Sequence, residues 1–238
     1  ELVDAVPESE PKSLATSWDE ATQDFRDAPW KEFTRSKAVW AMLSTHCAKN
    51  WGLYNYLAWT PIFYSEQYGI SFRDSAWLSV LPSVAGVAGG FIAGSIADSI
   101  IRNLKENDEQ AIANVRKLFQ GMSQYGPAAA FAALAWHIPE DPKVAQAYLM
   151  VAIGLMAFGA AGNEVSIQEK AGERWVGLLY SVTSLPAVMV GTFGVYITGQ
   201  LLDYTHQDWS YVFGLNAFVY VLGATAFVAW YDSYCCFD

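Results

Sequence analysis

The stretch SAWLSVLPSVAGVAGGFIAGSIA, residues 75–97, decides the fold, because it contains no charged side chain over its whole length. An α-helix needs about 20 predominantly apolar residues to cross the hydrocarbon core of a bilayer. We therefore predict that this stretch spans a membrane. Its glycines Gly86, Gly90 and Gly94 recur at every fourth position and share one helical face, where a second helix can approach closely. Helix packing is the expected role of this face, and a functional hinge is the alternative.

Five further stretches share this apolar character and are also predicted to span the membrane. They are residues 38–64, 115–137, 144–167, 175–202 and 209–230. Together the six stretches predict an all-α membrane protein with a six-helix transmembrane domain over residues 38–230. Residues 1–37 form a polar, acidic tail, and its end around Trp30 and Phe33 suits the membrane interface, because aromatic rings favour the headgroup level. Residues 231–238 form a short C-terminal tail.

Composition and charge narrow the class of protein. Hydrophobic residues make up 53% of the chain and charged residues only 16%, whereas soluble domains carry about 25% charged residues. The net charge of −10 argues against a nucleic-acid partner, which would need clustered lysine and arginine.

The basic residues are distributed unevenly between the connections of the predicted spans. Eleven of the 14 lie in the N-terminal tail, in the 98–117 segment or in the 168–174 loop, two lie in the other connections, and Lys49 lies within a span. Cytoplasmic loops of membrane proteins carry the excess of lysine and arginine. We therefore expect both termini on the positive, cytoplasm-like or stroma-like side of a multi-pass membrane protein.

The first predicted span carries the polar residues His46, Lys49, Asn50 and Tyr54. Spacings of three, four and eight residues place them on one helical face. An ionisable side chain at membrane depth is costly and usually faces a cavity or a partner, so this face is predicted to bind a substrate or to line a proton path. The alternative is a lysine that extends to the interface and a histidine that bonds a neighbouring carbonyl.

Asn163 and Glu164 come late in the fourth predicted span, after the small residues at 159–162. Glu164 could pair with Lys49 or exchange a proton, so Asn163 and Glu164 are candidates for coupling or gating. The alternative is that Glu164 lies at the interface and is simply hydrated. The sequence contains no phosphate-binding glycine loop, nucleophile elbow or metal-spaced histidine pair, so we expect no enzyme, no metal site and no cofactor.

A series of short motifs runs along most of the chain between residues 29 and 230. They are PWK at 29–31, SKAVWA at 36–41, NWGLY at 50–54, WTPIFY at 59–64, LSVLP at 78–82, GGFIAGSIAD at 89–98, VRK at 115–117, GQLLD at 199–203 and WSYVF at 209–213. In this combination they resemble the anion:cation symporter family of the major facilitator superfamily, which includes vesicular glutamate, sialin, sodium–phosphate and plastid phosphate transporters. The NWG and WTP pieces look most similar to the plastid type.

The resemblance implies that the six spans are helices seven to twelve of a twelve-helix fold. It implies a secondary active transporter of phosphate or an organic anion, coupled to H⁺ or Na⁺, in a plastid membrane such as the thylakoid or the envelope. It also implies alternating access against an N-terminal six-helix half, because the site of such transporters lies between two halves. Lys49 matches a position where family members carry histidine or arginine, so it is the leading candidate for contact with the anion.

The chain departs from the family pattern in two respects. Members carry Asn-x-x-Asp-Ile-x-Pro-Arg-Tyr-Ala-Gly after the tenth helix, whereas this chain reads NEVSIQEKAG at 163–172, with Ser166 in place of the aspartate and without the Pro-Arg pair. The first six helices are also absent, and because the chain begins at Glu1 rather than at methionine, we expect residues to precede it. A second hypothesis is therefore a structural subunit, in which a half-transporter joins other membrane subunits of a photosynthetic or respiratory complex.

Overall fold

The computed structural model describes residues 22–104 and 108–232, and all regular elements in these ranges are helices. In chain order they are α2 (Trp30–Arg35), α3 (Lys37–Tyr68), α4 (Phe72–Leu78), α5 (Val80–Arg102), α6 (Glu109–Trp136), α7 (Pro142–Met156), the 3₁₀ helix η1 (Ala157–Ala160), α8 (Asn163–Tyr204) and α9 (Trp209–Trp230). Residues 22–27 are helical as well. The predicted all-α class is confirmed for the described part of the chain.

Side-chain caps determine where most of the long helices begin. The hydroxyl of Ser36 accepts a hydrogen bond from the backbone amide of Val39 at the start of α3. The carboxylates of Asp108, Asp141 and Asp208 accept corresponding bonds at the starts of α6, α7 and α9. Each cap satisfies an amide that the first turn of a helix leaves unpaired. Because these polar residues lie in the connections, the predicted spans and the observed helices begin at similar positions.

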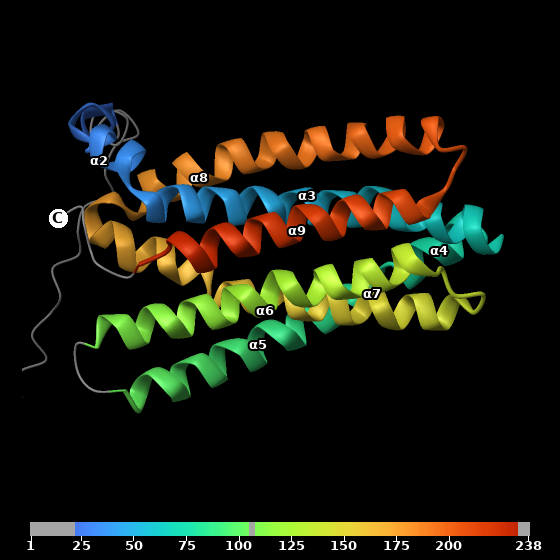
Figure 1. Cartoon of the computed structure of the whole chain (residues 1–238), viewed down its shortest axis with the longest axis horizontal. Coiled ribbons are helices and arrows are strands. Elements are labelled where there is room, and N and C mark those ends of the chain that lie inside the picture. The colour runs from blue at the N-terminus through green and yellow to red at the C-terminus, as the bar shows by residue number, and fades with distance from the viewer. Residues whose placement is uncertain (1–21, 105–107, 233–238) are drawn as a thin grey trace, which may run out of the picture.

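The long helices form one bundle and run along its longest dimension (Figure 1). α3 lies between α8 on one side and α9 on the other, and α6 packs against both α9 and α7. α5 packs against α7, and the C-terminal part of α8 lies at the edge of the bundle opposite α5. Aromatic side chains fill the core between α3, α6 and α9: the ring centroid of Phe63 lies 5.1 Å from that of Phe213 and 5.2 Å from that of Trp209.

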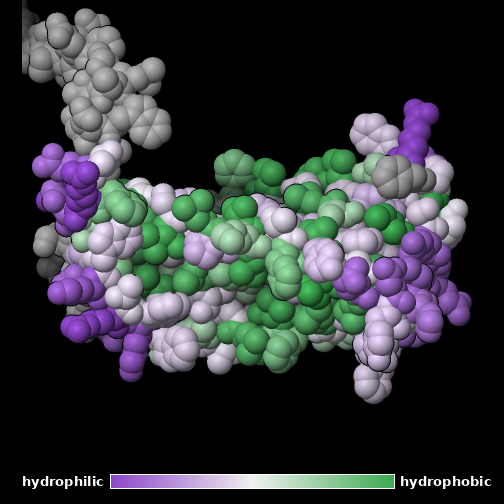
Figure 2. Space-filling view, turned by 90° about the horizontal axis from the view of Figure 1, so that it is seen from above, coloured by the Kyte–Doolittle hydropathy of each residue, from purple (hydrophilic) through white to green (hydrophobic). Residues whose placement is uncertain are grey.

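The surface has the pattern of a protein that crosses a bilayer. In Figure 2, hydrophobic residues cover the middle of the visible face and hydrophilic residues gather at both ends. Three helical stretches among the described residues are long and apolar enough to cross a membrane, namely Arg73–Arg102, Pro142–Tyr204 and Trp209–Trp230. The chain is therefore a multi-pass membrane protein. The number of six crossings stays a prediction, because α3 and α6 lie outside these three stretches.

Most predicted spans correspond to helices, and the second is interrupted. The first, third and sixth spans correspond to α3, α6 and α9. The second is divided between α4 and α5, which separate at Ser79. The hydroxyl of Tyr56 on α3 donates a hydrogen bond to the Ser79 carbonyl, so a side chain of the bundle satisfies a backbone group at this interruption.

The boundary between the fourth and fifth predicted spans requires a correction. The predicted loop 168–174 is wrong, because these residues are helical except at Gly172, which has φ 68° and ψ 176°. Glycine adopts positive φ without a steric penalty, so one residue is enough to reverse the chain. Figure 1 shows α8 turning back on itself there. We call residues 163–171 the short arm of α8 and residues 173–204 its long arm.

Phe33 lies in the core rather than at the surface expected for an interfacial ring. It is 1% exposed and belongs to a cluster with Met42 of α3 and Trp175 of α8. Trp30 is partly buried, and its ring meets that of Phe33 edge-on at 5.9 Å. α2 therefore anchors the chain to the bundle through apolar packing. Residues 1–21 and 233–238, which make up most of the two predicted tails, lie outside the described residues.

α5 approaches the backbone of α7 closely at Gly89. A Cβ atom on Gly89 would lie 2.1 Å from the carbonyl oxygen of Gly154 on α7. Among the predicted packing glycines, Gly86 also lies close to α7, whereas Gly90 has more room and Gly94 has no atom within 4 Å of its Cβ position. The contact with α7 therefore follows Gly86 and Gly89, because residues three apart also share a helical face.

We expect Gly89→Ala to lower the free energy of unfolding by about 1–3 kcal/mol, because the added methyl group would overlap a backbone carbonyl and force α5 away from α7. Gly94→Ala is the matched control, since its methyl group would enter open space and alanine favours a helix. Thermal unfolding of both variants in detergent measures the difference. Equal midpoints for the two variants would contradict this account of the α5–α7 contact.

Candidate functional site

Lys49 and Glu164 form an ion pair within the helical bundle. The Nζ atom of Lys49 lies 2.6 Å from Oε1 of Glu164, so the pair joins α3 to the short arm of α8. The two side chains are 31% and 22% exposed, which leaves both partly accessible. Lys49 lies well inside α3, between Lys37 and Tyr68. A paired carboxylate offsets the cost of holding a charge at that depth.

A break in the helical path positions Glu164. α7 ends at Met156, η1 follows, and Gly162 adopts φ −95° and ψ −106° before the short arm begins. Gly162 lies so close to α6 that a Cβ atom there would be 2.9 Å from the backbone nitrogen of Gln120. Oε1 of Gln120 accepts a hydrogen bond of 2.9 Å from the amide of Asn163, which replaces the cap that glycine cannot supply. Glu164 is consequently held in the first helical turn, where the helix dipole favours a negative charge.

The Gln120 side chain also connects the break in the helical path to α3. Nε2 of Gln120 donates to Oγ1 of Thr45 at 2.6 Å, and Nε2 of Gln124, one turn further along α6, donates to the Thr45 carbonyl at 2.8 Å. The Asn163 side chain is 2% exposed, and neither its Oδ1 nor its Nδ2 has a hydrogen-bonding partner among the described residues. A buried amide without partners is costly, so packing alone does not explain Asn163.

An open groove of about 440 Å³ lies beside Lys49, between α5 and the segment formed by α7 and η1. Its other lining residues are small or apolar: Gly86, Val87, Gly90, Phe91, Met156, Ala157 and Ala160. Among the described residues that line the groove, Lys49 is the one with a charge. An anion that enters the groove would therefore meet apolar walls and a single ammonium group.

His46 lies one turn from Lys49 and contacts the long arm of α8. Its Nδ1 atom lies 3.3 Å from Oγ1 of Thr183, and its ring meets that of Tyr180 edge-on at 5.6 Å. The side chain is buried, with 4% exposure. The interaction of His46 is thus with a hydroxyl of α8 rather than with the groove.

Asn50 and Tyr54 continue this strip of α3 along the long arm. Both lie against Gly191: a Cβ atom there would be 2.9 Å from the Asn50 carbonyl oxygen and 2.8 Å from the Tyr54 ring. The four residues predicted for one polar face therefore contact two different parts of the bundle. Lys49 reaches the groove and Glu164, whereas the other three lie at the contact between α3 and α8.

A second set of charges holds the short arm at its other end, in a pairing that no sequence pattern indicates. Arg116 on α6 donates through Nε to both carboxylate oxygens of Glu169 at 3.1 Å and through Nη1 to the Ala161 carbonyl at 3.0 Å. Lys170 is 1% exposed and pairs with Asp232, which follows α9. These partners are 53 and 62 positions apart in the chain, so only the fold brings them together.

The described residues contain no group of three or more His, Cys, Asp or Glu side chains that could hold a metal ion. The site contains the ammonium group of Lys49, which lies beside an accessible groove, and the carboxylate of Glu164, which is paired with that ammonium group. The ammonium group can bind an oxyanion through charge-assisted hydrogen bonds, and the carboxylate can accept a proton.

A bundle of apolar helices with a broken path beside a charged site is typical of the domains of secondary transporters. The family model of the Major Facilitator Superfamily matches residues 3–185, and the chain belongs to this superfamily. Membership confirms the resemblance that the motifs indicate, and the curated relatives carry the names of transporters rather than of enzymes.

Three curated relatives are similar to most of this chain. A protein of Oryza sativa subsp. japonica, "Probable anion transporter 5, chloroplastic", is 33% identical over 224 residues, which cover 94% of this chain and 46% of that protein. The "Ascorbate transporter, chloroplastic" of Arabidopsis thaliana is 31% identical over 196 residues, with 82% and 34% covered. The "Sodium-dependent phosphate transport protein 1, chloroplastic" of the same plant is 29% identical over 198 residues, with 83% and 37% covered. The chain thus spans less than half the length of these relatives.

We expect Arg116→Ala to lower the free energy of unfolding by roughly 2–4 kcal/mol, because it leaves Glu169 and the Ala161 carbonyl without their donor. Arg174→Ala is the matched control, since Arg174 is 61% exposed and lies 3.8 Å from Asp24, which is 53% exposed. Its loss should cost less than about 1 kcal/mol, even with its contact to the Trp175 ring. Unfolding in detergent measures both variants, and a larger loss for Arg174→Ala would contradict the assignment.

Proposed function

We propose that this chain is the C-terminal half of a secondary active transporter that carries phosphate or an organic anion across a plastid membrane. The position of Lys49 carries the proposal, because a lysine inside a helix of a membrane protein lies beside an open groove with one carboxylate as its partner. A cation in surroundings of low dielectric constant attracts an oxyanion strongly. The names of the relatives, which refer to anions, ascorbate and phosphate in chloroplasts, support an anion as the substrate.

In the proposed transporter, residues 38–230 cross the membrane six times. The crossings are α3, α4 with α5, α6, α7 with the short arm of α8, the long arm of α8, and α9. Residues 1–37 lead into this domain and residues 231–238 follow it. An N-terminal six-helix half faces the groove, and the two halves rock against each other around the bound anion.

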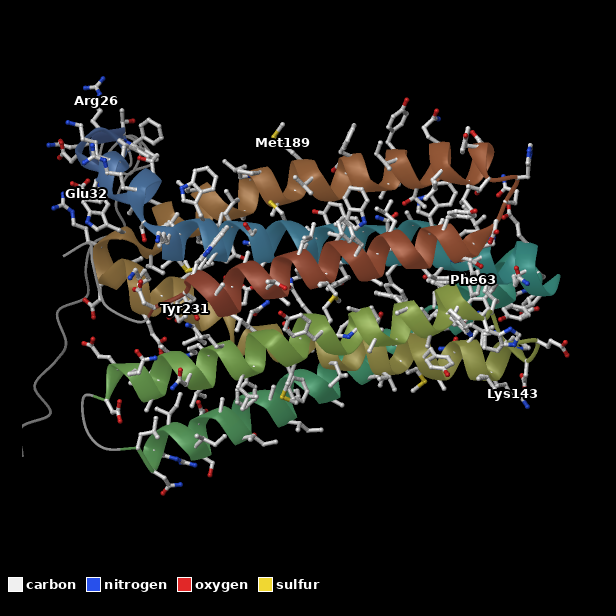
Figure 3. All side chains as sticks on the ribbon, viewed as in Figure 1. Arg26, Glu32, Phe63, Lys143, Met189 and Tyr231 are labelled. Carbon is white, nitrogen blue, oxygen red and sulfur yellow. The ribbon has the colours of Figure 1, made fainter. Side chains whose placement is uncertain are left out.

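The proposed orientation places both ends of the described chain on the stromal or cytoplasm-like side. Figure 3 shows Arg26 and Tyr231 at one end of the bundle and Lys143 at the opposite end. The end that holds Arg26 corresponds to the side with most of the lysine and arginine residues. The excess of basic residues on that side supports this orientation.

The polar residues of the site have distinct proposed roles. Lys49 binds the anion. His46, Asn50 and Tyr54 shape the path that the anion follows along the contact between α3 and α8. Asn163 and Glu164, at the break in the helical path, couple the anion to H⁺ or Na⁺.

Uptake by liposomes that contain the full-length protein tests the proposal, with labelled phosphate and labelled ascorbate as probes. We expect Lys49→Ala to raise the KM of the transported anion by about tenfold to a hundredfold, because a charge-assisted hydrogen bond contributes about 1.5–3 kcal/mol. Lys49→Arg keeps the charge and should retain most of the uptake.

Glu66→Gln is the matched control for charge removal from the same helix, since Glu66 is exposed near the end of α3. Size-exclusion chromatography verifies that each variant is folded. Absence of uptake of every tested anion by folded wild-type protein would refute the transporter and would favour the structural subunit.

A further inference from the structure

Another groove follows α6 on the surface of the bundle, separate from the groove beside Lys49. One hollow of about 510 Å³ lies along α6 and extends to Leu155 of α7 and Val228 of α9. A hollow of about 540 Å³ continues it between α6 and α7 as far as Val144. The two hollows share Gly126 and Leu155, so they form one continuous groove, which we call the α6–α7 groove.

The α6–α7 groove opens toward the lipid and away from the groove beside Lys49. On α7 the lining residues Val151 and Leu155 share one helical face, whereas Gly154 faces α5. Val151 and Leu118, which lines the groove from α6, are 53% and 54% exposed although both are apolar. In a helix that crosses a bilayer, such side chains contact hydrocarbon chains, which are as apolar as leucine. The α6–α7 groove is therefore distinct from the candidate anion site.

Lys117 places a positive charge at one end of the α6–α7 groove. Among the described residues that line the two hollows, it is the one with a charge. The charges close to it in the structure are already paired, Arg116 with Glu169 and Lys170 with Asp232. No ion pair joins Lys117 to another residue in the described ranges. Its ammonium group is consequently available to a ligand.

The position of Lys117 suits the headgroup of a lipid whose tail enters the groove. Lys117 follows the start of α6 at Glu109 by about two turns, and Val228 of the same hollow lies close in sequence to the exposed Trp230. Tryptophan favours the headgroup level, and a lysine can extend its ammonium group to that level along apolar surface. From Lys117 to Ala130 the groove follows α6 for roughly 20 Å. One leaflet of a hydrocarbon core is about 15 Å thick, so an acyl chain fits along this length.

We infer that the α6–α7 groove binds a membrane lipid with an anionic headgroup. The phosphate group of the lipid pairs with Lys117, and one acyl chain lies between α6 and α7. Gly121, Gly126 and Ala129 provide room for this chain, because their small side chains leave the groove open. Basic pockets between membrane-spanning helices on the positively charged side of a protein bind anionic headgroups in this way.

A second copy of this chain would satisfy the groove less well than a lipid. Two copies with the same orientation in a membrane meet about a two-fold axis, which would place both Lys117 side chains at the same depth in one interface. The described residues that line the groove include no carboxylate that could balance them. A lipid phosphate brings the negative charge that the second copy would lack.

Native mass spectrometry of the full-length protein in detergent tests the inference, with equal concentrations of phosphatidylglycerol, which is anionic, and phosphatidylcholine, which is zwitterionic. For the wild type we expect a preference for phosphatidylglycerol of about fivefold in the first bound lipid, because one lysine near the membrane surface contributes about that factor. Lys117→Ala should bind both lipids equally. Lys31→Ala is the matched control and should keep the preference, since Lys31 is an exposed lysine of α2 at the same end of the bundle (Figure 1).

Ala129→Leu tests the groove without removing a charge. Ala129 lines the groove and is exposed, so a larger side chain there enters the groove and not the core. We expect this variant to bind phosphatidylglycerol about fourfold more weakly, because each methylene group displaced from apolar surface costs about that factor. In the wild type, phosphatidylglycerol with a photoreactive acyl chain should label α6 and α7. Size-exclusion chromatography verifies that each variant is folded.

Equal binding of the two lipids by folded wild-type protein would overturn the inference. A preference for phosphatidylglycerol that persists in Lys117→Ala would do the same, and so would labelling confined to other helices. A dimer that Ala129→Leu dissociates without changing the lipid preference would assign the groove to a second copy and would also overturn the lipid site. None of these measurements depends on transport, so their failure leaves the proposed function untouched.

Discussion

Lys49 places a positive charge inside a long helix of a membrane protein, and much of the surrounding structure follows from the need to balance that charge. A lone ammonium group at this depth would be expensive, so a carboxylate has to reach it from another helix. Glu164 meets that need because the path of α7 is interrupted before the short arm begins. The interruption leaves backbone groups to satisfy, and Gln120 from α6 supplies the acceptor for the first amide of the short arm.

The short arm of α8 therefore connects two sets of charges. Its first turn carries the carboxylate that meets Lys49, and its last turn carries Glu169 and Lys170, which pair with Arg116 and Asp232. Gly172 then reverses the chain into the long arm. Ion pairs therefore hold both ends of the short arm against α3, α6 and the residues that follow α9.

Local sequence properties predicted a large part of the fold. A bilayer requires long apolar helices, so the uncharged stretch at 75–97 and its counterparts were sufficient to predict the all-α membrane class. The spans predicted to begin at 38, 144 and 209 start within two residues of the helices that begin at Lys37, Pro142 and Trp209. The loop predicted at 168–174 is wrong for a specific reason. Charged residues are typical of connections, but here they belong to the two helical arms that meet at Gly172, where the chain reverses. The observed glycine contact also differs from the predicted one, because Gly89 faces α7 once the helices are packed and Gly94 does not.

By itself the sequence determined the class of protein, the approximate helices and the position of Lys49 inside a predicted span, because hydropathy and charge at membrane depth are local properties. The tertiary structure decided which groups meet. Glu164 is 115 positions from Lys49, and Thr183 is 137 positions from His46. Helical periodicity places residues on a face but does not state which helix will face them. The division of the polar strip, with Lys49 at the groove and His46, Asn50 and Tyr54 against α8, therefore depends on how α5, α7 and α8 pack around α3.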